Sequence, residues 1–107
     1  MSAADVLKLS QVYLEALRRW EEAKATLITS TAGLEIARRE CEDAKTELLA
    51  AIRGAIPLAE ALELTQQYGR AVRKAQDAEK AFAAAEKAER ETGRVEKTTI
   101  AQLAGVS

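Results

Sequence analysis

The chain has 107 residues, the length of one domain, and a net charge of −1 from 16 basic and 17 acidic residues. Because both signs are mixed along the sequence, no broad field favours nucleic acid or an anionic membrane. With no His and one Cys, the chain lacks the residues for His-based acid–base catalysis and thiolate zinc sites. We therefore expect a protein that is not an enzyme and uses no cofactor or metal.

Near the N-terminus, Ser2 or Asp5 is expected to cap a first helix. From Val6 to Ala55, apolar or small residues recur every seventh position without a change of register. This spacing keeps residues on one face of a helix and predicts a long helix that lies along another helix. One series is Val6, Tyr13, Trp20, Leu27, Leu34, Cys41, Leu48 and Ala55, and the other is Leu9, Ala16, Ala23, Ser30, Ala37, Ala44 and Ala51.

The weakest point of this first helix is Thr29 to Gly33, where three hydroxyl residues and a Gly occur together. The repeat keeps its phase across this stretch, which favours one continuous helix. The alternative is a break here, which would give a three-helix bundle.

The clearest interruption is Gly54-Ala55-Ile56-Pro57. Gly54 can adopt the left-handed conformation that ends a helix, and Pro57 suits the first turn of the next one. The pattern predicts a tight turn at 54–57 and an antiparallel helical hairpin.

A second helix is expected from about Leu58 to about Glu91, with Gly93 as its C-cap. Its stripe is rich in Ala and predicts a coiled-coil-like interface of closely spaced helices. A close helix crossing would explain Gly69, and a functional hinge is the alternative. The stripe consists of Ala61, Leu64, Tyr68, Ala71, Val72, Ala75, Ala78, Phe82 and Ala85.

Residues 93–107 form the tail, in which a short helix capped by Thr98 or Thr99 and closed by Gly105 is expected. The segment Thr98–Ser107 also resembles the first helix and turn of a helix-turn-helix DNA reader of the bacterial sugar-repressor type. The resemblance implies that Ile100 and Leu103 are core residues, with Ala104 as a small packing residue and 105–107 as the turn. The recognition helix of that motif would begin where the sequence given stops.

The predicted domains are thus a hairpin over residues 1–92 and a tail over 93–107. If the second helix folds back from Pro57, it pairs with residues of about 20 to 53. The segment Ala3–Arg19 then has no partner helix within the chain. The apolar arc is widest there, and a soluble monomer rarely exposes such a surface. We predict that this region contacts another chain, most simply a second copy. The predicted interface residues are Val6, Leu9, Val12, Tyr13, Leu17 and Trp20.

The expected function is that of a self-associating adaptor or assembly component, such as a bacterial or phage accessory protein. Two alternatives are the dimerisation part of a DNA-associated regulator with a truncated helix-turn-helix, and a small inhibitor of another protein. No apolar run approaches the roughly 20 residues that span a bilayer, and no signal-peptide pattern is present. The lone Cys41 lies on the apolar stripe and suits a small core residue in a reducing, cytoplasmic compartment.

Overall fold

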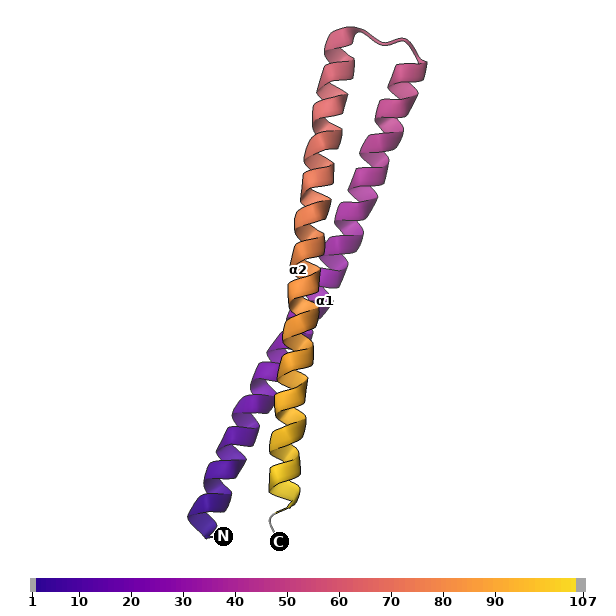
Figure 1. Cartoon of the computed structure of the whole chain (residues 1–107). Coiled ribbons are helices and arrows are strands. Elements are labelled where there is room, and N and C mark those ends of the chain that lie inside the picture. The colour runs from indigo at the N-terminus through magenta and orange to yellow at the C-terminus, as the bar shows by residue number, and fades with distance from the viewer. Residues whose placement is uncertain (1, 106–107) are drawn as a thin grey trace. The chain divides into compact units, whose positions relative to one another are not determined.

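The chain forms two helices in the computed structural model, which describes residues 2–105. Helix α1 (Ala3–Arg53) and helix α2 (Leu58–Ala104) are joined by a short turn (Figure 1). No strand occurs among the described residues. The predicted all-α helical hairpin is therefore confirmed. Because α1 continues through Thr29–Gly33, the alternative three-helix bundle is excluded.

Two compact units make up the hairpin, and each contains a piece of both helices. The terminal unit comprises Met1–Thr29 and Ala83–Ser107, and the turn unit comprises Ser30–Phe82. The boundary predicted between residues 92 and 93 lies inside the continuous helix α2.

The heptad repeat places its residues where the sequence predicts. In α1 both series are buried or half-buried from Val6 to Ala51, and in α2 the whole predicted stripe is as well. We label the Val6 series a and the Leu9 series d, and in α2 the series that begin at Ala61 and Leu64 are a and d, respectively. Positions e and b then lie on one flank of this seam, and g and c lie on the other.

The core that these seams form is thin. The buried hydrophobic residues are Ala16, Leu34, Ala37 and Ala85, so Leu34 is the one large apolar side chain among them. The chain exposes 7768 Å², whereas a compact folded protein of 11.6 kDa exposes about 5,800 Å². Each helix therefore buries little more than one stripe, and much apolar surface remains accessible.

The N-terminus of α1 has a reciprocal cap. The backbone N–H of Asp5 donates to the Ser2 hydroxyl at 3.2 Å, and the Ser2 N–H and hydroxyl donate to the Asp5 carboxylate at 3.1 and 2.9 Å. These bonds lower the pKa of Asp5, because they stabilise its charged form. The expected capping role of Ser2 and Asp5 is confirmed.

The turn lies at the predicted residues 54–57, with one correction to its conformation. The left-handed residue is Ala55, with φ at 52°, and not Gly54. The Gly54 N–H still bonds to the carbonyls of Ala50 and Ala51, which prolongs the helical hydrogen bonding by one residue and moves the reversal to Ala55. The Pro57 carbonyl then accepts the first hydrogen bonds of α2.

Helix α2 is longer than predicted, and the expected separate C-terminal helix forms its last turns. Gly93 is a helix-interior residue and not a C-cap. The Thr98 and Thr99 hydroxyls bond carbonyls of the preceding turn and do not cap a new helix. The Gly105 N–H bonds the Ala101 carbonyl at 3.0 Å and closes α2. Residues 106 and 107, which belong to the proposed helix-turn-helix turn, lie outside the described residues.

This extension overturns the expectation that the segment Ala3–Arg19 is left unpaired. It lies in the terminal unit with the last turns of α2. The explanation of Gly69 by a close crossing with α1 is also wrong. Gly69 is exposed, and a Cβ added there would meet no atom within 4 Å.

Candidate functional site

A polar contact occurs in the seam of the terminal unit, where the chain's single Trp meets a carboxylate. The Nε1–H of Trp20 donates to Glu89 Oε1 at 3.2 Å, and the two side chains are half-buried. On the Trp20 ring lies the ammonium of Lys24, 4.0 Å from the ring centroid, in the geometry of a cation–π contact. The indole is thus held at its edge and on one face.

Gly93 provides the space that this indole occupies. A Cβ at Gly93 would lie 3.0 Å from Trp20 Nε1 and 3.4 Å from Trp20 Cδ1. Gly93 is buried, although its neighbours on α2 are mostly charged. The close approach of the α2 backbone to Trp20 therefore explains this glycine.

A second polar contact joins Tyr13 to Glu96, which is only 8% exposed. The pKa of Tyr13 is raised, first because its hydroxyl is partly desolvated, and then by the charge and hydrogen bonding of Glu96. Close by, the buried Thr99 hydroxyl donates to the Glu96 carbonyl at 2.9 Å. The two aromatic residues of α1 that were predicted to form an interface thus have carboxylate partners on α2.

Sequence reasoning missed these α2 residues because it followed apolar side chains and stopped at Ala85. The spacing itself continues, since Glu89 and Glu96 follow Phe82 at intervals of seven, and Thr92 and Thr99 follow Ala85 in the same way. Half-buried or buried positions follow this spacing to Leu103. Spacing alone, without regard to polarity, would have found them.

The six predicted interface residues divide into two groups. Five are half-buried in the terminal unit: Val6, Leu9, Tyr13, Leu17 and Trp20. Val12 is 52% exposed and lines a shallow groove of about 500 Å³ with Val95 of α2, Lys8 and Arg19. The structure therefore brings Val12 to a surface and Trp20 and Tyr13 into the seam. That these residues contact another chain stays a prediction.

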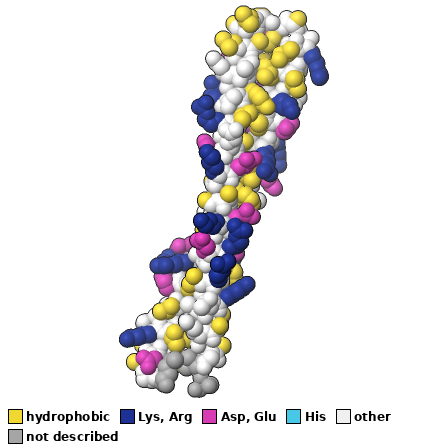
Figure 2. Space-filling model, in the orientation of Figure 1, with side chains coloured by type: hydrophobic (Ala, Val, Ile, Leu, Met, Phe, Trp, Pro, Cys, Tyr) yellow, Lys and Arg dark blue, Asp and Glu magenta, His cyan; other side chains and the backbone are white. Residues whose placement is uncertain are grey.

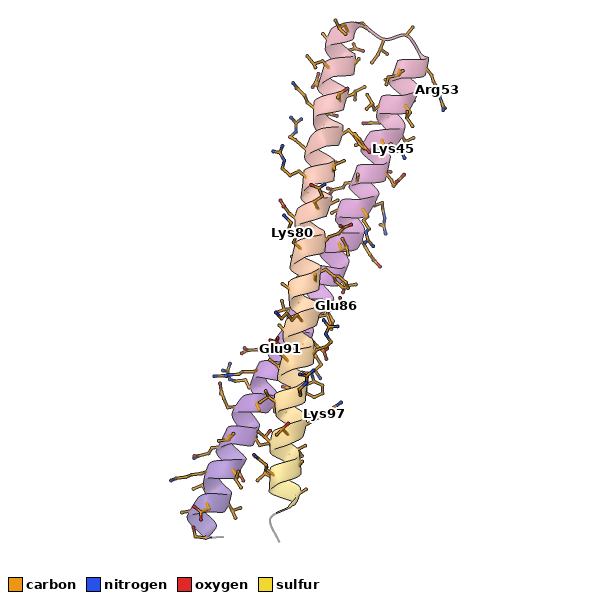
Figure 3. All side chains as sticks on the ribbon, viewed as in Figure 1. Lys45, Arg53, Lys80, Glu86, Glu91 and Lys97 are labelled. Carbon is orange, nitrogen blue, oxygen red and sulfur yellow. The ribbon has the colours of Figure 1, made fainter. Side chains whose placement is uncertain are left out.

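A second, smaller pocket lies beside Trp20 and Gly93. It is bordered by three cations of α2 (Arg90, Arg94 and Lys97) and by Glu89. Figure 3 labels Lys97 of this pocket and Glu91, which lines a separate small pocket with Arg19 and Val95. The terminal unit thus combines charged and apolar side chains on both flanks.

In the turn unit, two ion pairs define the flanks. Arg38 pairs with Glu79 at 3.6 Å, which joins the e positions of the two helices. Glu40 pairs with Lys74 at 2.8 Å, which joins the g positions. Both pairs are exposed, so each adds at most about 1 kcal/mol to stability. They show that the helices are antiparallel, with the e and b positions of both on one flank.

Large exposed apolar residues of the turn unit concentrate on this e/b flank. Four of the five hold e or b positions, and Ile36, at c, is the exception. The four lie within two turns of the chain reversal, near which hydrophobic side chains gather in Figure 2. We call them the turn-end patch: Leu49 (43% exposed), Ile52 (59%), Leu58 (85%) and Leu62 (58%).

Few charges lie near this patch. Residues 48–69 contain three charged side chains, although 31% of the whole chain is charged. Glu60 and Glu63 hold the g and c positions of the other flank, and Arg53 holds an f position. No ion pair of these three occurs among the described residues. The turn end is therefore apolar on one flank and acidic on the other.

Within residues 2–105, no three His, Cys, Asp or Glu side chains are grouped to hold a metal ion. Neither α1 nor α2 has an apolar stretch long enough to cross a membrane. Comparison with family models, curated proteins and solved structures found no match to the chain.

Proposed function

We propose that this protein is a cytoplasmic, non-enzymatic interaction module, a helical hairpin that associates with itself and serves as an adaptor or assembly component. The observation that carries the proposal is the thin core. Within residues 2–105, Leu34 is the one large apolar side chain among the buried hydrophobic residues, whereas eleven large apolar side chains are exposed.

The area of the exposed surface supports the same proposal. The chain exposes about 1,900 Å² more than a compact protein of its mass. A standard protein–protein interface takes about 800 Å² from each partner. Association with a second copy therefore offers the hairpin the apolar burial that its own seam does not supply.

The alternative functions have less support. In a DNA-associated regulator, residues 98–104 would form the first helix of a separate reader, whereas here they are the end of α2. An inhibitor of another protein would use the same exposed surfaces. The mass of the purified chain in solution distinguishes this function from self-association.

Sedimentation equilibrium over micromolar to millimolar concentrations tests the proposal. Self-association predicts a mass that rises from 11.6 kDa to at least twice that value. A mass that stays at 11.6 kDa throughout the range contradicts it.

A further inference from the structure

We infer that the turn-end patch is the surface through which two copies of the chain associate, in a symmetric dimer that packs the turn-end patch of one hairpin against that of the other. The inference rests on the proposed self-association and adds its location. It therefore moves the interface from the N-terminal residues that the sequence suggested to the turn unit.

The first observation is that both helices contribute to one surface. Leu49 and Ile52 come from the last turns of α1, and Leu58 and Leu62 from the first turns of α2. Their exposed fractions are 43–85%, so a large part of their apolar area is not covered by the hairpin itself. A surface made by two helices side by side is complementary to another such surface, as in a four-helix bundle.

Gly69 gives an independent observation. It holds a b position one heptad beyond Leu62 on the same flank. A glycine inside a helix costs about 1 kcal/mol relative to Ala, and nothing in the hairpin explains it, because a Cβ there would meet no atom within 4 Å. Gly33, on the opposite flank, is equally open, so Gly69 does not by itself locate the interface. Beside the turn-end patch, Gly69 provides room for a second helix to approach closely.

The low charge of the turn end suits a second copy as the occupant. Between residues 48 and 69 the net charge is −1, from Arg53, Glu60 and Glu63. The two acidic residues lie on the opposite flank, so two turn-end patches can meet without strong repulsion. The shortage of Lys and Arg does not suit an anionic membrane surface, which attracts basic clusters.

The experiment compares dimer dissociation constants by sedimentation equilibrium for the whole chain and matched variants. In the double variant Leu58→Glu/Leu62→Glu, four carboxylates enter the interface of a symmetric dimer, and we expect the Kd to rise about 100-fold or more. The control is Leu7→Glu/Leu14→Glu, whose two sites hold b positions in the terminal unit and are 60% and 61% exposed. Its Kd should stay within about twofold of the wild-type value.

A second pair of variants keeps the charge constant. An added methyl at Gly69 prevents the close approach, so Gly69→Ala should weaken the dimer about tenfold. Gly33→Ala is the matched control, because Gly33 is also exposed, has no atom near an added Cβ and holds a g position. Circular dichroism of all variants reports whether the hairpin is retained, which exposed substitutions should allow.

The outcomes separate the two proposals. A wild-type chain that remains monomeric overturns both self-association and this location. A wild-type dimer that dissociates in Leu7→Glu/Leu14→Glu or in Val12→Glu, but not in Leu58→Glu/Leu62→Glu, overturns only the location. Binding of the monomeric wild-type chain to neutral phosphatidylcholine vesicles, lost in Leu58→Glu/Leu62→Glu, would assign the patch to a lipid surface and overturn the dimer.

Discussion

Gly93→Ala should destabilise the hairpin, although Ala favours a helix. The exchange of an interior Gly for Ala stabilises a helix by about 1 kcal/mol. At Gly93 the new Cβ would lie 3.0 Å from Trp20 Nε1, so the indole must move away. Such overpacking costs about 1–3 kcal/mol, and loss of the Trp20–Glu89 hydrogen bond costs about 1.5 kcal/mol more. The expected net loss is about 1.5–3.5 kcal/mol.

Gly33→Ala is the control for this prediction, because an added Cβ at Gly33 meets nothing within 4 Å and should give the gain of about 1 kcal/mol alone. Urea unfolding at one low protein concentration, followed by circular dichroism, measures both changes. Trp20, as the single Trp, also reports the movement of the indole through its fluorescence. Equal stabilisation by the two substitutions, with unchanged fluorescence, would refute the account of Gly93.

Three further predictions concern the turn, an ion pair and the polar seam. Ala55→Gly should raise the stability by about 0.5–1 kcal/mol in thermal unfolding, because Ala55 is left-handed; a loss would contradict this. Hydrogen bonds from Arg18 and Arg19 lower the pKa of Glu15 from 4.5 to about 2. The stabilisation that these hydrogen bonds give the folded chain is therefore present above pH 4.5 and is lost as the pH falls toward 2. Glu15→Gln should therefore lower the Tm at neutral pH but not near pH 2, and high salt should reduce the difference; a difference that persists in acid is the contrary result. In a chain whose other tyrosine is replaced by Phe, absorbance titration should give a pKa above 10 for Tyr13. Glu96→Gln should lower this pKa only partly, because desolvation is the largest cause of the raised pKa. A Tyr13 pKa at or below 10 with Glu96 in place would be inconsistent with the contact between Tyr13 and Glu96.

The sequence predicts most of the fold because its heptad spacing and its helix propensity both favour long helices. The two series of α1 and the stripe of α2 occupy the seam as expected, and the phase across Thr29–Gly33 correctly indicates a continuous helix. Antiparallel packing follows from a turn at 54–57, which is too short for another arrangement of long helices.

The sequence did not reveal where α2 ends, and this had the largest effect on the candidate site. Thr92-Gly93 has the composition of a helix end, and Glu89 and Glu96 are polar at seam positions. Tertiary contacts overrule both signals, because Trp20 fills the space at Gly93 and donates to Glu89, while Tyr13 contacts Glu96. These partners are about 70 residues or more away in the sequence, so local patterns do not report them.

The turn-end patch was visible in the sequence as a scarcity of charge between residues 48 and 69. The sequence did not show that the apolar residues of both helices lie on the same flank. Each helix alone shows apolar residues on several faces there. The ion pairs Arg38–Glu79 and Glu40–Lys74 fix which flanks coincide, and only then do Leu49, Ile52, Leu58 and Leu62 form one surface.

The dissociation constant of Leu58→Glu/Leu62→Glu, measured by sedimentation equilibrium beside the wild-type chain, decides whether the turn-end patch forms the dimer interface. If it does, the wild-type chain is a dimer of twice 11.6 kDa and the double variant is folded and monomeric at the same concentration. A wild-type chain that sediments at 11.6 kDa up to millimolar concentration, or a double variant that dimerises as tightly as the wild type, would contradict it.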